Sequence, residues 1–169
     1  MATGLIGTTH RGLLVCWRYL PFWARRIAIR ALYPQFPLGA VAVIRDRDGR
    51  VLLVRQTYHR QEMWGPPGGW VARGETPRSA AARETFEEVG LRVRVGRLLA
   101  QDGGPYGEIS LAFECRLADD CPVSFSDEID RAAYFPPDEL PPLPSGTKRL
   151  LRQAFATQED PTMAHQWAQ

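Results

Sequence analysis

The stretch Gly69-Trp70-Val71-Ala72-Arg73-Gly74-Glu75 is followed, after residues 76–82, by Arg83-Glu84-Thr85-Phe86-Glu87-Glu88-Val89-Gly90-Leu91. On a helix that turns about 100° per residue, Glu84, Glu87 and Glu88 share an arc of about 100°. Like charges at these spacings cost a helix about 0.2–0.5 kcal/mol per pair, so the pattern favours a counter-charge. Mg²⁺ prefers oxygen ligands and commonly sits between carboxylates and substrate phosphates. The stretch is therefore a candidate Mg²⁺ (or Mn²⁺) site, and a solvated acidic face is the alternative.

The same stretch resembles the Nudix box, the signature of the Nudix (MutT-like) hydrolases, at every spacing from Gly69 to Leu91. Thr85 departs from the family pattern, which usually has an aliphatic residue there, and we expect it to affect packing. The similarity extends over about residues 38–156. It implies an α/β fold, an α/β/α sandwich around a mixed β-sheet, to which this chain adds an N-terminal helical extension.

The resemblance also implies roles for individual residues. The implied metal ligands are the backbone carbonyl of Gly69 and the carboxylates of Glu84, Glu87 and Glu88. Arg83 would pair with Glu75 and orient the helix against the preceding loop. The alternative for this pair is an ordinary surface ion pair, worth about 0–1 kcal/mol.

Hydrolysis of a diphosphate also needs a base for the attacking water. Glu84 or Glu87 could serve, but members of the family place the base differently. The candidates beyond the box are Glu108, Glu114, Asp127 and Glu128, each with surface solvation as the alternative. Glu128 is the first choice, because it begins the Glu-Ile segment before the last expected strand. Related sequences often place an acidic residue there. The predicted catalytic residues are Arg83, Glu84, Glu87 and Glu128.

Substrate identity is less well determined by the sequence. The predicted substrate contacts are Arg55, Tyr58, Arg60, Trp64 and Tyr106, with packing as the alternative for the aromatic residues. The NADH-diphosphatase signature downstream of the box is absent. We expect a hydrolase that cleaves a nucleoside diphosphate linked to another moiety, either a nucleoside triphosphate or an ADP-ribose-like compound. One alternative is a non-catalytic nucleotide-sensing domain. Another, the prenyl-diphosphate isomerase branch, uses a cysteine before the box, and none lies between Cys16 and Cys115.

Composition is typical of a small globular enzyme, with 169 residues, 44% apolar and 24% charged. The three cysteines lack metal-type spacing, which favours a reducing cytoplasm, and no apolar run reaches the ~20 residues of a transmembrane helix. The expected partner is a small nucleotide, without nucleic acid and without stable membrane insertion. Residues 1–34 carry five arginines and no acidic residue, so the rest of the chain has a net charge of −3.

Three segments are expected: a basic, aromatic helical extension at 1–34, a Nudix domain at 35–157 and a flexible tail at 158–169. The extension reads as helical over 12–33 with a break at Pro21. It should pack against the domain or form a homodimer, while binding to an anionic membrane surface is the alternative. The expected strands are 38–45 and 51–58, joined as a hairpin, then 70–72, 91–99, 108–117 and 129–135. The main helix should start at Thr76 and Pro77 and stop at Gly90, and Leu150, Leu151, Ala154 and Phe155 should form the apolar stripe of a final helix.

Overall fold

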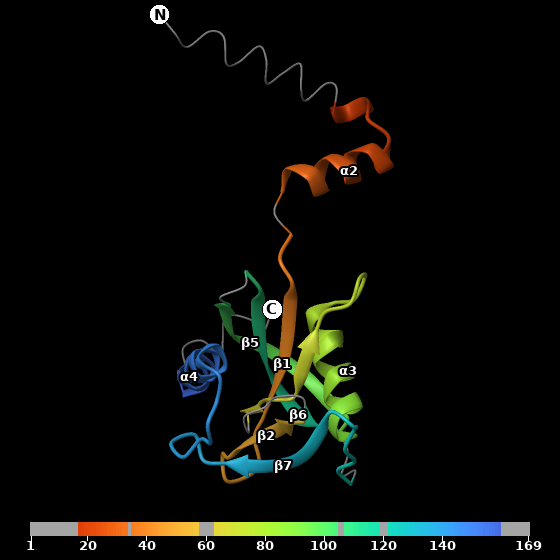
Figure 1. The fold of residues 1–169 in the computed structure, drawn as a ribbon. Coiled ribbons are helices and arrows are strands. Elements are labelled where there is room, and N and C mark those ends of the chain that lie inside the picture. Colours follow the sequence, from red (N-terminus) through yellow and green to blue (C-terminus); the bar gives the residue numbers. More distant parts are fainter. Residues whose placement is uncertain (1–16, 34, 58–62, 105–106, 119–121, 160–169) are drawn as a thin grey trace, which may run out of the picture. The chain divides into compact units, whose positions relative to one another are not determined.

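The structure, a computed structural model, describes residues 17–33, 35–57, 63–104, 107–118 and 122–159. The chain divides into two compact units, 1–35 and 36–169, which are considered separately (Figure 1). In the second unit, the larger sheet has the strand order β4 (Gly68–Trp70), β1 (Leu38–Ile44), β6 (Ile109–Leu117) and β5 (Val93–Gly103). Strand β1 is parallel to β6, and the other pairs are antiparallel, so this sheet is mixed as predicted.

A smaller antiparallel sheet has the order β3 (Trp64–Gly65), β2 (Val51–Gln56) and β7 (Ile129–Phe135). The strand β3 was not predicted, because a pair of residues directly before a proline carries no periodicity. Strand β4 covers Gly68–Trp70, two residues before the predicted 70–72. Strand β6 lies where the alternation of side chains predicted it, and β7 has the predicted bounds. Strand β5 covers Val93–Gly103, so it starts two residues later and ends four residues later than the predicted 91–99.

Two helices cover the strands from opposite sides, α3 (Pro77–Val89) and α4 (Ser145–Glu159). Alternate residues of β1 face the two helices. Ala40, Ala42 and Ile44 join the core cluster that contains α3 residues, whereas Val43 joins the cluster that contains α4 residues. The continuous apolar runs therefore belong to strands buried on both faces, as predicted. The helix α4 buries the predicted stripe and continues to Glu159, past the predicted domain end at 157.

The predicted hairpin between the first two strands is right only at its turn. Asp46 accepts backbone hydrogen bonds from Asp48 and Arg50 through Oδ1, and Gly49 has a φ of 80°. An isolated antiparallel bridge joins Arg45 to Val51. Beyond this bridge the strands part, since β1 belongs to the larger sheet and β2 to the smaller one. Turn chemistry fixes the reversal of the chain, but the partners of each strand are set by distant segments.

In the first unit, α2 (Phe22–Leu32) begins directly after Pro21, which confirms the predicted break. Within the unit, no residue of α2 is buried. None of the helices in the described parts of the chain has the length and apolar character needed to cross a bilayer. Of the three cysteines, Cys115 lies in the core, where burial raises the pKa of its thiol to about 12, and the other two fall outside the described residues.

Candidate functional site on helix α3

The sequence fixes both ends of α3. Thr76 caps the N-terminus by accepting a hydrogen bond from the Ser79 amide through its hydroxyl, and Pro77 occupies the first turn. Gly90 ends the helix with a φ of 71°, in the left-handed region that favours glycine. Thr85 is fully buried, and its hydroxyl donates to the Ala81 carbonyl at 2.7 Å. The hydroxyl is thus satisfied within the helix, in keeping with a packing role.

Arg83 joins the helix to the loop that precedes it. Its guanidinium donates to both carboxylate oxygens of Glu75, at 2.9 and 3.0 Å, and to the Trp70 carbonyl at 3.1 Å. The predicted pair is therefore present. Hydrogen bonds from Arg83 and from the Ala72 amide lower the pKa of Glu75 to about 2. In the other direction, Glu75 is the largest contributor to a raised pKa of Arg83.

The same guanidinium also binds two of the three carboxylates that were predicted to be metal ligands. Its Nη1 donates to Glu84 and to Glu87, both at 2.8 Å. The repulsion between these carboxylates is thus partly relieved by a side chain of the same helix. The sequence argument expected a divalent cation to relieve this repulsion and assigned Arg83 only to Glu75. Spacing alone could not show the contacts with Glu84 and Glu87, because Arg83 could equally have pointed only toward Glu75.

Glu88 is the buried member of the acidic face, with 7% of its surface exposed. Its carboxylate accepts a hydrogen bond from the Gly68 amide at 2.9 Å. Burial, together with the charges of Glu84, Glu128 and Glu87, raises the pKa of Glu88 to about 7, although the Gly68 bond opposes the shift. A carboxyl group in this position is held close to its charge transition at neutral pH.

Two consecutive glycines, Gly68 just before the box and Gly69 at its start, lie in close contact with neighbouring groups. A Cβ atom on Gly69 would lie 2.5 Å from Cδ of Glu84, so the Glu84 carboxylate would have to move away from β4 if this residue had a side chain. A Cβ atom on Gly68 would lie 2.4 Å from the Ala40 carbonyl oxygen, and Gly68 has a φ of 153°. Gly68 is a site residue that the sequence interpretation did not select. The signal was the Gly68-Gly69 pair itself, of which only the second member belongs to the box.

Glu128 lies close enough to α3 for its charge to act on Glu88. Its segment is anchored from both sides, since the Glu128 carbonyl accepts from the Thr57 amide at 2.8 Å and the Ser126 amide donates to the Glu88 carbonyl at 3.1 Å. Among the alternative bases, Glu114 is engaged by Arg97 and Arg116 on the strands β5 and β6.

The carboxylates of this site are suitable ligands for a divalent cation. Three carboxylates, those of Glu75, Glu84 and Glu87, bind the Arg83 guanidinium, and Glu88 and Glu128 lie near enough for their charges to interact. Hard oxygen donors are the ligands that Mg²⁺ and Mn²⁺ prefer. Yet within the described ranges no three acidic, histidine or cysteine side chains converge on one point as a ready-made metal cluster. The chemistry of the donors fits a hard cation. To reach Glu84 and Glu87, such a cation would compete with Arg83.

The predicted substrate contacts are only partly described. Tyr58, Arg60 and Tyr106 lie outside the described residues. Arg55 on β2 makes a two-point ion pair with Asp130 on β7, and this pairing lowers the pKa of the Asp130 carboxyl. Trp64 packs edge-on against Phe135, with ring centroids 5.0 Å apart. Arg55 thus has a structural partner that the sequence did not reveal, because Asp130 is 75 residues away.

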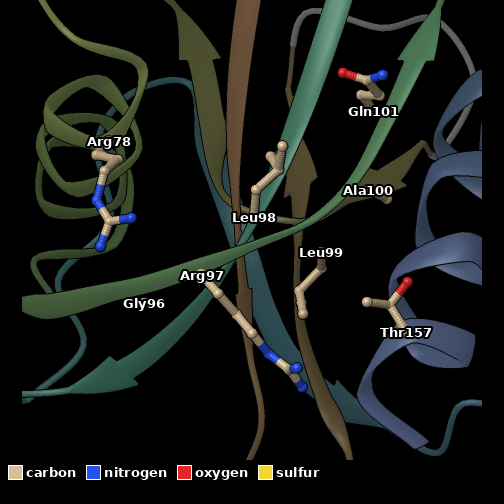
Figure 2. A pocket seen from close by; sticks show the side chains of 8 residues that line it. All are labelled: Arg78, Gly96, Arg97, Leu98, Leu99, Ala100, Gln101 and Thr157. Carbon is tan, nitrogen blue, oxygen red and sulfur yellow. The ribbon is translucent and has the colours of Figure 1, made fainter. Parts of the chain in front are cut away.

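Two hollows differ in their relation to this site. One of about 340 Å³ adjoins the acidic helix through Gly68, and its lining includes Trp64, Asp102 and Glu108. Another of about 640 Å³ runs along β5, where Arg78 enters from α3 and Thr157 from α4, with Arg97 and Leu99 between them (Figure 2). The four glutamates of the site line neither hollow, but Gly68, whose amide donates to Glu88, lines the first hollow and not the second. The smaller hollow is therefore the one that continues the acidic site.

Several known proteins resemble this chain in sequence or in fold. The family model described as NUDIX domain matches residues 35–154. An NAD-capped RNA hydrolase NudC from Klebsiella pneumoniae is 35% identical over 128 residues, which are 73% of this chain and 49% of that protein. An ADP-ribose pyrophosphatase from Streptococcus suis aligns with a TM-score of 0.65 at 25% identity, covering 75% of this chain and 95% of that one. A MutT NUDIX hydrolase from Burkholderia pseudomallei aligns with a TM-score of 0.59 at 30% identity, covering 71% and 98%. The chain spans about half the length of the curated relatives it matches.

Proposed function

Because the chain belongs to the Nudix family, we propose that it is a Mg²⁺- or Mn²⁺-dependent diphosphohydrolase that cleaves a nucleoside diphosphate linked to another moiety. The observation that carries the proposal is the cluster of four mutually interacting carboxyl groups, of which only two bind an arginine; the members are Glu84 and Glu87, which bind Arg83, and Glu88 and Glu128. Such an excess of carboxylates in one place is unfavourable without a cation and is a common arrangement where diphosphates are hydrolysed.

Glu84, Glu87, Glu88 and the Gly69 carbonyl would hold the cation. When bound, it would supply positive charge that offsets the charge of the diphosphate and of its leaving phosphate. Arg83 and Glu75 would keep the helix and the loop in register, so that the glutamates stay in place. The hollow beside Gly68 is about 340 Å³, which is at the lower end of typical ligand pockets and suits part of a nucleotide.

In the bond-breaking step, a water oxygen forms a bond to one phosphorus while the bridging P–O bond breaks, and the bridging oxygen leaves with the other phosphate. The proton of the water passes to a carboxylate. We propose Glu128 for this role, because it stands beside Glu88 on a segment anchored to β2 and α3. Glu108, which lines the hollow next to Gly68, is the second candidate.

The experiment is a substrate panel assayed with the full chain. It contains ATP, ADP-ribose, NADH, diadenosine tetraphosphate and an NAD-capped RNA, each with Mg²⁺, with Mn²⁺ and with EDTA, and products are separated by chromatography. We expect cleavage of a small-nucleotide member at the diphosphate linkage, only with the cation. Faster cleavage of the capped RNA would overturn the expectation of a small substrate. The proposal that the protein is a hydrolase would still stand.

A nucleotide-sensing domain is the competing function, favoured by one observation: Arg83 already neutralises part of the acidic face in this structure. It predicts saturable binding of a nucleotide, measured by calorimetry, without turnover of any member of the panel. Cation-dependent turnover excludes it.

A further inference from the structure

Residues 17–33 carry large apolar side chains that their own unit leaves exposed. Phe22 is 80% exposed, Leu32 74% and Trp23 66%. The other exposed members are Trp17, Tyr19, Leu20, Ile27, Ile29 and Tyr33. The segment lies before residue 35, where the match to the NUDIX domain begins, so the chemistry of the domain does not account for it.

The apolar residues of α2 have an ordered distribution around the helix. At about 100° per residue, an arc of about 180° runs from Trp23 through Ile27 to Leu32, filled between them by alanines and free of charge. All three arginines of the helix, Arg25, Arg26 and Arg30, fall in the remaining arc, which also holds Phe22 and Ile29. This distribution is that of a helix with one side suited to an apolar phase and the other to anions.

The charge of the segment has one sign. Residues 17–33 contain four arginines and no acidic residue. The side chain of Arg25 bonds back to the Arg18 carbonyl at 2.7 Å, while Arg26 and Arg30 are exposed 40° to 80° away from Phe22 around the helix. The anionic partner must therefore meet Arg26 and Arg30 and also cover the apolar arc.

We propose that residues 17–33 dock the protein on the surface of a lipid bilayer that contains anionic headgroups. A second copy of the segment could cover the apolar arc, but it would leave the arginines of the remaining arc without an anion. A nucleic acid would satisfy the arginines but leave the apolar arc in water. An anionic bilayer meets both demands, since headgroups bind the arginines while Trp23 and Ile27 enter the boundary of the acyl chains. The helix is too short to span, so the contact is peripheral.

The test is co-sedimentation of the full chain with vesicles. Vesicles of phosphatidylglycerol mixed with phosphatidylcholine are compared with vesicles of phosphatidylcholine alone, at low and high salt. We expect sedimentation with the anionic vesicles that weakens as salt rises. Equal binding to both kinds of vesicle, or to neither, overturns the proposal.

Point variants locate the contact without removing the segment. Arg26→Gln/Arg30→Gln should weaken partitioning about 25-fold, at about fivefold per basic residue. Trp23→Ser/Ile27→Ser should weaken partitioning at least tenfold, because the two apolar side chains that would enter the bilayer are lost. The matched control is Arg94→Gln/Arg116→Gln, which removes the same charge from neighbouring positions of β5 and β6 and should bind as the native protein does.

Two further measurements test the alternative partners, a second copy of the chain and RNA. Each variant is checked for nucleotide turnover and melting temperature, which should equal those of the native protein. Sedimentation velocity and RNA binding by filter retention are measured in parallel. A dimer that Trp23→Ser/Ile27→Ser dissociates, or RNA binding that Arg26→Gln/Arg30→Gln abolishes, each without lipid binding, overturns the proposal.

Discussion

Helices α3 and α4 cover opposite sides of the same strands, but they bury different kinds of side chain. The helix α4 buries Leu150, Leu151, Ala154 and Phe155, and Arg45 lies over the Phe155 ring at 4.7 Å. The helix α3 buries Ala80, Ala81 and Val89, and with them Thr85 and Glu88. One helix therefore contributes apolar area to the core, whereas the other gives up part of its inner face to a carboxylate. The difference teaches that two helices packed on the same strands can bury different chemistry, and it puts the proposed site on the α3 side of the domain.

The largest expected effect is on stability and comes from α4. Leu151 is fully buried, and Leu151→Ala should lower the free energy of unfolding by about 2–5 kcal/mol through lost burial and a new cavity. Urea unfolding followed by circular dichroism measures it. Arg152→Ala, an exposed change on the same helix, should stay within about 0.5 kcal/mol. Turnover per folded molecule should be unchanged in both, and a turnover lost with Leu151→Ala alone would contradict the division between the helices.

On the α3 side the large effect should be on turnover. Glu88→Gln and Glu87→Gln should each lower kcat at least 100-fold, equivalent to about 2.7 kcal/mol of barrier, because a charge near the reacting diphosphate is lost. The substrate found with the panel is used under saturating cation. Glu139→Gln, on the loop that leads to α4, makes the same change of charge and should retain activity. Full activity in both α3 variants would refute the assignment of the site.

Much of this division could be predicted from the sequence. The caps at Thr76 and Gly90 and the periodicity of the box placed α3, because these signals are local. The apolar stripe placed α4, and the uninterrupted apolar run of 38–44 predicted a strand buried on both faces.

What the sequence could not provide depends on distant partners. The segment 51–56 reads as a strand, but nothing in it indicates that it pairs with β7 in a sheet of its own. The sequence allowed Arg55 to be predicted as a substrate contact, but it did not show that Arg55 pairs with Asp130. In the box, the spacing put three carboxylates on one face. In the structure Glu84 binds Arg83, and Glu88 accepts from the Gly68 amide. These partners depend on side-chain rotamers, which the spacing of the residues does not determine.

A third, smaller effect should appear in the pH dependence of stability. The pKa of Glu88 is raised from its ordinary 4.5 to about 7, so the folded state keeps a proton that the unfolded chain releases. The cation-free protein should therefore lose about 1–3 kcal/mol of stability between pH 5 and pH 8, at about 1.4 kcal/mol per pKa unit. Thermal melts in EDTA measure it. Glu88→Gln should flatten the profile and hold its stability at pH 8. A native profile that rises over this range would contradict the burial of the carboxyl group.

The smallest expected effect concerns the pair that joins α3 to its loop. Glu75→Gln removes the charge that Arg83 binds at two points, but leaves a side chain that can still accept one of the two hydrogen bonds. Because Glu75 is expected to orient the helix and not to bind the cation, kcat should fall only about tenfold. The apparent affinity for Mg²⁺, measured from the dependence of turnover on cation concentration, should weaken together with kcat. In the reverse direction, Arg83→Lys should show a similar loss, since an ammonium group cannot hold Glu75, Glu84 and Glu87 in one planar arrangement. If Glu75→Gln proved as severe as Glu88→Gln, the carboxylate of Glu75 would have to act on the cation or the substrate directly. If neither variant changed turnover, the pair would be a surface ion pair and the register of α3 would be set by Gly68 and Gly69 alone.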